Sequence, residues 1–481
     1  MRLRFRSKLE ETVYPAILKH MLLPVGETLR GTSVLCRLRQ LEQSQWESSE
    51  RLRELQKEKL RRLVHHAYEH VPYYRRVFEE RGMRPEDIAT PEDLSKLPVL
   101  TKEETRRQFR DQISADNCKG NDYLRLHSSG STGEPYHFYL SKAGHDARLA
   151  AMFRYWRAAG YDFGQPWVRI RVSLDISLAD RVYHRLMRCA YLRYMAASER
   201  VLLEQLEKIR RVRPTVVRGY APALFMLAKT ARDHDMNDFG VRSMISTGSI
   251  LFPHFRQLIE SQFDCPVYDV YGGEGMIIAG QFECGSYHIH AEGVVVEFLK
   301  PGGDAARPGE LGSIVLTNLN NLAMPFIRYQ IGDLGVPSKA GCSCGRGLPV
   351  MESIQGRDTD IVVTPDGGYL IVHFFTRVFN SANVDQFQVI QHAPDRIEIK
   401  IVRNELFTRA DVDYILRSIR SAGGDELKVD LRYVESIPLT RSGKRRFVIS
   451  EVGQGHFRSG MGRAASESHR GRVLTREFSN S

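Results

Sequence analysis

The segment HSSGSTG (residues 127–133) carries too little side chain to contribute to a hydrophobic core. It follows a candidate strand, YLRLH (123–127), and precedes a candidate helix that begins near Lys142. Gly130 and Gly133 permit positive φ angles, so that successive backbone N–H groups can converge on an anion. A phosphate-binding loop and a solvent-exposed linker are the two interpretations. Its spacing excludes a Walker A loop and a G-x-S-x-G nucleophile elbow.

The pattern around this loop predicts an α/β fold with a largely parallel sheet. Strand candidates alternate with helix candidates from about residue 120, and they include VRIRVSL (168–174), TVVRGY, VRSMIST and PVYDVYG. Such alternation is typical of βαβ units, in which ligands bind at the carboxyl ends of the strands. The loops after His127, Ser246 and Val270 are expected to lie at such ends.

Beyond Gly285 the runs YHIHAEGVVVEFLK, GELGSIVLTNL and PFIRYQIGDLG are each bounded by Gly or Pro, which predicts a β-rich subdomain, antiparallel or barrel-like. From Ile361 strands and one helix predict a small α+β domain. The expected organisation therefore has four parts: an N-terminal helical arm (1–50), a large domain with mixed or parallel sheets and helices (51–357), a small mobile C-terminal domain (358–450) and a disordered basic tail (451–481).

Composition excludes several classes of protein. The net charge of +11 comes from basic residues interspersed with acidic ones, so no nucleic-acid partner is expected. Seven cysteines spread over 481 residues are not a disulfide framework and fit the reducing cytoplasm. The apolar stretch at 14–25 is interrupted by Lys19 and His20, so it is too short and polar to span a bilayer, although contact with a membrane surface stays possible.

Five motifs follow one another in the order and approximate separation typical of adenylate-forming enzymes: SSGSTGEP (128–135), YGGE (271–274), RYQIGDLG (328–335), GRDTD (356–360) and LTRSGK (439–444). Over roughly residues 55–450 the chain resembles the phenylacetate–CoA ligase family, including relatives associated with capsular polysaccharide biosynthesis. The resemblance implies an enzyme that joins a carboxylic acid to ATP, releases pyrophosphate and passes the acyl group to a thiol, commonly coenzyme A. The alternatives are transfer to a sugar or amine, and a non-catalytic nucleotide-binding protein.

The resemblance also implies roles for single residues. Thr132 would donate a hydrogen bond to the β- and γ-phosphates, and Glu274 would bind Mg²⁺, a hard cation that suits a carboxylate. Lys444 would stabilise charge that develops during adenylation. These three are the expected catalytic residues. The other expected nucleotide-binding residues are those of the phosphate loop, the adenine wall and the ribose site: Ser128, Ser129, Gly130, Ser131, Gly133, Gly248, Ser249, Tyr271, Gly272, Gly273, Asp333 and Arg357.

Each role has a simpler alternative. Glu274 could cap a helix, Asp333 could form a turn after a glycine, and Lys444 could be solvated. The chain also departs from the family pattern, because no lysine follows the phosphate loop and YGGE is one residue shorter than Y-G-x-T-E. The usual hinge position is occupied by Thr359.

Three cysteines and a histidine form a candidate zinc site. Cys342 and Cys344 lie in a Gly-rich turn, and Cys284 precedes His288 on a predicted strand. These four ligands suit tetrahedral Zn²⁺, and a site with no position for water is structural. His290 could replace His288, which the resemblance favours; buried thiols without metal are the other interpretation.

Overall fold

The computed structural model describes ten segments of the chain: 13–108, 112–120, 122–128, 136–171, 177–193, 199–357, 361–365, 369–438, 446–450 and 452. Several predicted features lie outside these residues, namely phosphate-loop residues 129–133, Thr359, Lys444 and nearly all of the tail from residue 451. The described chain divides into two compact units. The first comprises Met1–Val296, Leu316–Tyr329 and Gly341–Val350, and the second comprises Glu297–Val315, Gln330–Ala340 and Met351–Ser481.

The N-terminal part of the first unit is helical in the residues described. Its helices end and begin at residues with the expected capping chemistry: Gly31 takes a left-handed conformation after α2, and the Ser48 side chain accepts a hydrogen bond from the Arg51 N–H. The α-helices are α1 (Tyr14–Ile17), α2 (Leu23–Arg30), α3 (Val34–Ser44), α4 (Ser49–His70), α5 (Pro72–Glu80) and α6 (Lys102–Arg107). Within the described residues no helix is long and apolar enough to cross a membrane.

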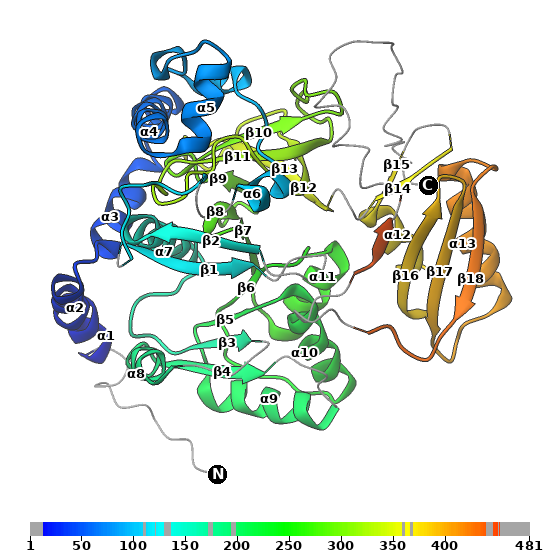
Figure 1. Cartoon of the computed structure of the whole chain (residues 1–481). Helices are drawn as coiled ribbons and strands as arrows, with labels where there is room; N and C mark the ends of the chain where they lie inside the picture. Colours follow the sequence, from blue (N-terminus) through cyan, green and yellow to red (C-terminus); the bar gives the residue numbers. More distant parts are fainter. Residues whose placement is uncertain are drawn as a thin grey trace. The chain divides into compact units, whose positions relative to one another are not determined.

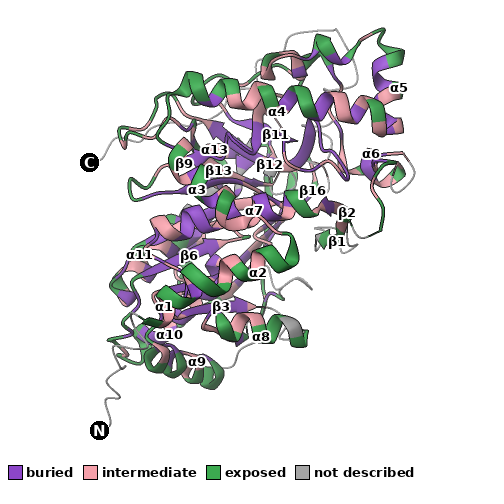
Figure 2. Ribbon diagram, turned by 90° about the vertical axis from the view of Figure 1, so that its left-hand side faces the viewer, coloured by how far each residue is buried: buried purple, intermediate pink, exposed green. Residues whose placement is uncertain are grey.

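The predicted parallel α/β arrangement is confirmed. Five strands pair in parallel in the order β4-β3-β5-β6-β7: β3 (Trp167–Arg171), β4 (Cys189–Arg193), β5 (Val216–Gly219), β6 (Ser243–Thr247) and β7 (Val267–Gly273). The helices that connect or cover them are α7 (Lys142–Ala158), α8 (Leu178–Leu186), α9 (Glu199–Val212), α10 (Ala221–Asp233) and α11 (Pro253–Phe263). Strands β3 and β6 are largely buried, whereas α9 exposes one face, as Figure 2 shows.

The strands after Gly285 extend this sheet and do not form a separate barrel. They are β9 (Tyr287–Ile289), β10 (Val294–Leu299), β11 (Gly312–Asn318), β12 (Tyr329–Pro337) and β13 (Val350–Arg357). Together with β8 (Met276–Gln281), they complete the order β10-β11-β12-β13-β9-β8-β7-β6-β5-β3-β4 (Figure 1). The alternation of apolar residues predicted the strands correctly, but it carries no information about which neighbours each strand takes.

One predicted position is wrong. The segment 127–133 does not connect a parallel strand to a helix, because β1 (Tyr123–Ser128) pairs antiparallel with β2 (Tyr136–Ser141) in a separate two-stranded sheet. Helix α7 begins only after β2, where the Ser141 side chain accepts a hydrogen bond from the Gly144 N–H. The strand YHFYLS is a short run rich in aromatic residues, which is the signal that could have revealed it.

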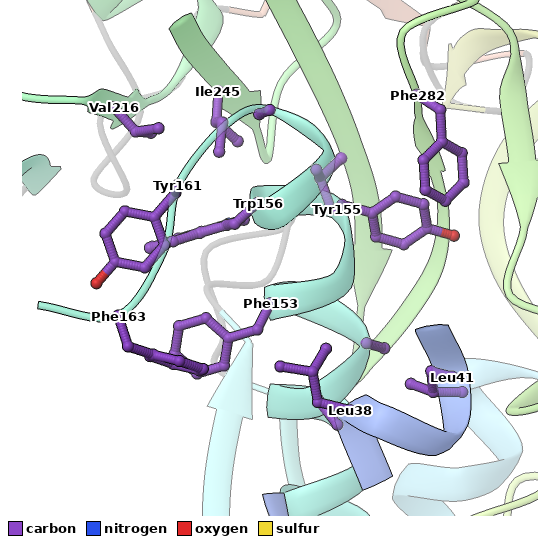
Figure 3. Packing of buried hydrophobic residues seen from close by; sticks show 14 of the residues in the cluster. Leu38, Leu41, Phe153, Tyr155, Trp156, Tyr161, Phe163, Val216, Ile245 and Phe282 are labelled. Carbon is purple, nitrogen blue, oxygen red and sulfur yellow. The ribbon is translucent and has the colours of Figure 1, made fainter. Parts of the chain in front are cut away.

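Aromatic side chains of α7 form the main core of the first unit. Phe153, Tyr155 and Trp156 are nearly fully buried, and the Trp156 ring lies edge-on to Trp167 of β3 with centroids 4.8 Å apart. Val216 and Ile245 reach the same cluster from β5 and β6 (Figure 3). Each such side chain contributes roughly 1.5–3 kcal/mol through burial, so α7 is firmly seated on this face of the sheet.

The C-terminal part of the second unit is the predicted small α+β structure. Its four-stranded sheet has the order β18-β17-β16-β19, and Ile397, Ile399 and Ile401 of β17 are fully buried. The elements are β14 (Ile361–Val363), β15 (Tyr369–Ile371), α12 (Val372–Asn380), β16 (Val384–Ala393), β17 (Arg396–Arg403), α13 (Arg409–Gly423), β18 (Lys428–Tyr433) and β19 (Val448–Ser450).

Candidate nucleotide and metal sites

The predicted adenine-wall residues lie together at the carboxyl ends of β6 and β7. Gly248 follows β6 with a φ of 71°, and a Cβ at this position would lie 3.2 Å from the Tyr220 ring. The Ser249 hydroxyl is buried without a hydrogen-bond partner in the described part of the chain. Since β6 and β7 are adjacent parallel strands, these residues share the edge of the sheet at which ligands usually bind.

Gly272 is required by the backbone itself. A Cβ at this position would lie 2.4 Å from the Met276 carbonyl oxygen, which is closer than a Cβ can approach. The cause is the tight β7–β8 turn, in which the register shifts between Tyr271 and Gly272. Gly272 therefore lets the two backbone segments of this turn approach closely.

Glu274 occupies this turn and does not cap a helix. Its φ is 41° and that of Gly275 is 78°, a left-handed pair that leads directly into β8. The carboxylate is largely buried and forms an ion pair with Lys102, with Oε1 and Nζ 3.1 Å apart. Sequence reasoning missed Lys102, because nothing in the local pattern of α6 indicates a partner so distant in the chain. Glu274 is thus a buried carboxylate that a cation already neutralises.

Asp333 and Arg357, in the second unit, are direct cross-strand partners. They face each other in the antiparallel β12–β13 pair, and Arg357 Nε lies 3.7 Å from Asp333 Oδ1. Gly332, with a φ of 86°, precedes Asp333 within the strand. The two residues that were expected to bind the ribose therefore lie side by side, with the Arg357 guanidinium next to the Asp333 carboxylate.

The four predicted zinc ligands converge in the first unit. One ligand atom from each of Cys284, His288, Cys342 and Cys344 lies within 4.8 Å of all the others. Cys344 Sγ is 3.3 Å from His288 Nε2, while the other ring nitrogen of His288 lies 3.0 Å from the Ser286 carbonyl oxygen. This second contact directs Nε2 towards the thiols, as a metal-binding histidine requires.

The protonation chemistry of this cluster suits a soft cation. Burial lowers the pKa of His288, so its imidazole is neutral and can donate a lone pair to a metal. Burial raises the pKa of Cys284. Burial also acts to raise the pKa of Cys342, but hydrogen bonds from the Cys344 backbone and the neighbouring thiols outweigh it and lower that pKa. Two short loops thus bring together the donor set of a closed tetrahedral site.

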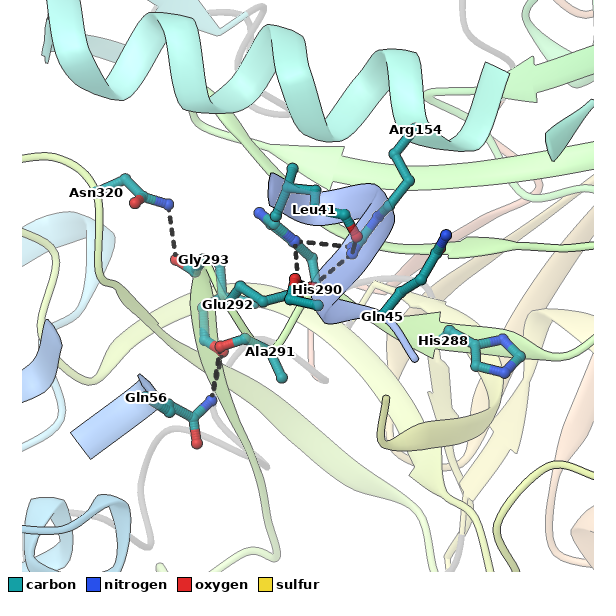
Figure 4. A network of polar contacts seen from close by, with 12 residues as sticks. Leu41, Gln45, Gln56, Arg154, His288, His290, Ala291, Glu292, Gly293 and Asn320 are labelled. Atoms are coloured by element: carbon teal, nitrogen blue, oxygen red, sulfur yellow. Dashed lines mark hydrogen bonds and ion pairs between the residues drawn. The ribbon is translucent and has the colours of Figure 1, made fainter. Parts of the chain in front are cut away.

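His290 does not substitute for His288. Its Nδ1 lies 2.9 Å from Arg154 Nη2 and 3.2 Å from Glu292 Oε2 (Figure 4). His288 lies apart from this network in the same view. Because its ring contacts Arg154 of α7 and Glu292, His290 belongs to a buried polar network and not to the metal cluster.

Similarity to known proteins extends over most of the chain. It is 26% identical over 440 residues to the phenylacetate-coenzyme A ligase of Thermus thermophilus, with 83% of this chain and 96% of the relative covered. It is 22% identical over 421 residues to Protein CapK of Staphylococcus aureus, with 83% and 89% covered. Residues 362–451 match the family model of the CapK C-terminal domain.

Solved structures agree with this relationship. A 2-hydroxyisobutyryl-CoA ligase, solved in the postadenylation state, aligns with a TM-score of 0.70 at 19% identity and covers 87% of this chain and 93% of that chain. An anthranilate CoA ligase, AuaEII, aligns with a TM-score of 0.51 at 16% identity over 75% and 74% of the two chains. The chain has the fold of adenylate-forming CoA ligases.

Proposed function

Since this chain is a homologue of phenylacetate–coenzyme A ligases and of Protein CapK, we propose that it is an ATP-dependent acid ligase. In the first step the carboxylate oxygen attacks the α-phosphorus of ATP, which forms an acyl adenylate and releases pyrophosphate. In the second step the sulfur of coenzyme A attacks the acyl carbon, which forms a thioester and releases AMP. Pyrophosphate and AMP leave as anions, so the protein must supply cations and N–H donors that stabilise the negative charge as it develops.

One observation carries this proposal: the turn that begins at Gly272 holds a buried carboxylate at the ligand-binding edge of a parallel sheet. Glu274 would hold Mg²⁺, which would neutralise charge on the phosphates of ATP, and its Lys102 partner would then be available to a phosphate oxygen. Tyr271, Gly272 and Gly273, together with Gly248 and Ser249, would line the adenine. The free hydroxyl of Ser249 would then find a hydrogen-bond acceptor on the nucleotide.

The remaining roles rest on the motifs. Asp333 would accept hydrogen bonds from the ribose hydroxyls, and Arg357, which pairs with its carboxylate, would support the ribose and the adenylate phosphate. Ser128, Ser129, Gly130, Ser131, Thr132 and Gly133 would hold the outer phosphates, and Lys444 would approach from residues 358–450 as a mobile domain. A rotation of that domain after adenylation would admit coenzyme A.

We propose that the Cys284, His288, Cys342 and Cys344 cluster binds one structural Zn²⁺. All four donors come from the protein, so no position is left for a reacting water molecule. The ion would fix the loop after β8 to the turn that precedes β13. Arg346 supports this assembly, because its guanidinium lies over the Phe282 and Trp46 rings.

A second function differs only in the acyl acceptor. The match of residues 362–451 to the CapK C-terminal domain supports transfer of the acyl or aminoacyl group to a sugar or an amine in polysaccharide synthesis. Either chemistry draws ATP from the cytoplasm, which is the proposed location. Weak contact with a membrane surface stays a prediction, supported by apolar side chains such as Leu29 and Leu178, which are 82% and 77% exposed.

Acid-dependent exchange of labelled pyrophosphate into ATP tests the common first step. Addition of coenzyme A and detection of a thioester by mass spectrometry then separates the two acceptors. A protein that binds ATP but supports no exchange with any acid would be a non-catalytic nucleotide-binding protein.

A further inference from the structure

Four arginines gather on one face of the parallel sheet in the first unit. Arg169 and Arg171 lie on β3, and Arg218 lies on β5, where it is the register partner of Arg169. Partners on adjacent parallel strands project their side chains to the same face, with backbones about 4.8 Å apart. Helix α7 covers this face and contributes Arg148. The fold therefore places positive charges from three elements together.

These arginines are partly buried and lack acidic partners among the described residues. The Arg148 Nε is buried and makes no hydrogen bond to any described residue. The Arg218 guanidinium lies over the Trp156 ring at 5.7 Å, and that of Arg171 lies over the Tyr191 ring at 5.9 Å. Among the ion pairs of the described residues, none joins a carboxylate to any of the four arginines.

Four neighbouring arginines destabilise the folded protein unless an anion binds between them. Like charges on paired strands repel one another, and burial removes the water that would otherwise solvate them. Burial and the nearby Arg169 charge accordingly lower the pKa of Arg218 to about 9. Burial, followed by the charge of Arg169, also lowers the pKa of Arg148. A bound anion removes both costs, whereas a core built only for stability would use apolar residues here.

The cluster adjoins the proposed nucleotide site. Tyr220 follows Arg218 by two residues, and a Cβ at Gly248, in the proposed adenine wall, would lie 3.2 Å from its ring. Arg148 also lines a small, open pocket together with Ala147, Gly275 and Met276, and Gly275 is the residue after Glu274. An acid whose carboxylate lies near the α-phosphate could therefore extend its far end towards the arginines.

We propose that Arg148, Arg169, Arg171 and Arg218 bind a second anionic group of the acid substrate, so that the acid activated here carries an additional carboxylate or a phosphate. This inference rests on the proposed ligase function and specifies its substrate class. Guanidinium groups suit either anion, because their planar N–H donors match carboxylate and phosphate oxygens. Apolar aryl or alkyl acids would leave the four charges unpaired.

The first test compares acids that differ only in the distal group. ATP–pyrophosphate exchange is measured with valerate against glutarate, phenylacetate against 4-carboxyphenylacetate, and glycerate against 3-phosphoglycerate. The expected result is that at least one dianionic acid exceeds its matched partner by about 10-fold or more in kcat/KM. The pair that responds distinguishes carboxylate from phosphate. Exchange only with the singly charged members would overturn the inference while leaving the ligase function intact.

The second test uses variants. R148M and R218M should remove this preference without changing the KM for ATP. The matched control is R210M, since Arg210 is an exposed residue of α9 paired with Glu207. The proposal would be contradicted if R148M and R218M both kept the wild-type preference for the dianionic acid.

A binding measurement separates this inference from the ligase function. Citrate, glutarate and inorganic phosphate are used as probes in thermal unfolding of the full chain. At least one should raise the Tm of the wild type by about 2 °C or more but not that of R148M or R218M, even if no acid supports exchange. Without a probe, R218M should be at least as stable as the wild type, because it removes a repulsive charge. The proposal would be contradicted if no probe raised the Tm of the wild type and R218M were less stable than the wild type. This result would mean that groups of the protein itself, and not a bound anion, compensate the charges of the arginines.

Discussion

Arg154 and Glu292 form a buried ion pair, with Nη1 and Oε1 2.7 Å apart and side-chain exposures of 1% and 4%. The Ser44 hydroxyl donates to the same carboxylate oxygen, and His290 contacts the other. The pair therefore joins α7 and α3 to the segment that follows β9. Neither side chain can leave this pair without strong destabilisation, because the other charge would then stay buried without a partner.

Glu292→Gln should lower the free energy of unfolding by about 3 kcal/mol or more, because it leaves the Arg154 guanidinium buried without a counter-charge. Urea denaturation measures the change. Glu204→Gln is the matched control, since Glu204 pairs with Arg200 on an exposed helix face and should cost less than about 1 kcal/mol. Equal effects of the two substitutions would contradict the assigned importance of the buried pair.

The same pair predicts acid sensitivity. Burial alone would raise the pKa of Glu292, but the Arg154 charge and the His290 hydrogen bond hold it well below its usual value. The unfolded chain therefore takes up a proton that the folded chain does not. The contribution of Glu292 is fully present above a pH of about 4.3 and is lost as the pH falls further. Urea midpoints between neutral pH and about pH 3 should fall more steeply for the wild type than for Glu292→Gln; parallel curves would exclude this linkage.

Gly272→Ala should disrupt the turn that holds Glu274. The added Cβ would meet the Met276 carbonyl oxygen at 2.4 Å, and relief of this clash should cost about 2 kcal/mol or more. Gly341→Ala is the control, because no atom lies within 4 Å of its Cβ position. Thermal unfolding compares the variants. A Gly272→Ala protein as stable as Gly341→Ala would mean that the turn is less constrained than its geometry indicates.

The cysteine cluster predicts about one zinc ion per chain in the purified protein. Elemental analysis of Cys344→Ser should find most of this zinc missing, and a chelator should lower the Tm of the wild type. Cys36→Ser should retain the metal, because Cys36 is exposed on α3 outside the cluster. Metal-free wild type that a chelator does not destabilise would identify the cluster as four unligated side chains.

The fold was predictable where periodicity carried the information. The parallel strands around Val217 and Ile245 are short apolar runs between amphipathic helices, and the C-terminal α+β elements alternate clearly. The position of the 127–133 loop was wrong because the hairpin partner YHFYLS was not recognised as a strand. Local pattern also carries no information about strand order. The residues after Gly285 were therefore expected to form a subdomain of their own, antiparallel or barrel-like. Their pairs β8–β9 and β12–β13 are antiparallel, but they belong to the large sheet.

The candidate sites were predictable only as sets of residues. The order of the motifs indicated Asp333 and Arg357, and in the structure these two residues are cross-strand partners. Lys102, Arg154 and the arginine cluster escaped prediction, because each depends on contacts between elements far apart in the chain. A lone Lys or Arg on a helix or strand is usually solvated, so its sequence context gives no reason to single it out.

Acid-dependent ATP–pyrophosphate exchange tests the central claim most directly. The wild type should exchange label in the presence of Mg²⁺ and a suitable acid, and Glu274→Gln should reduce the rate about 100-fold or more, because the metal that neutralises developing charge is lost. Lys96→Met, which alters an exposed pair with Asp93, should leave the rate unchanged. Exchange that persists undiminished in Glu274→Gln would contradict the proposed role of the β7–β8 turn, and its absence from the wild type with every acid would contradict the ligase function itself.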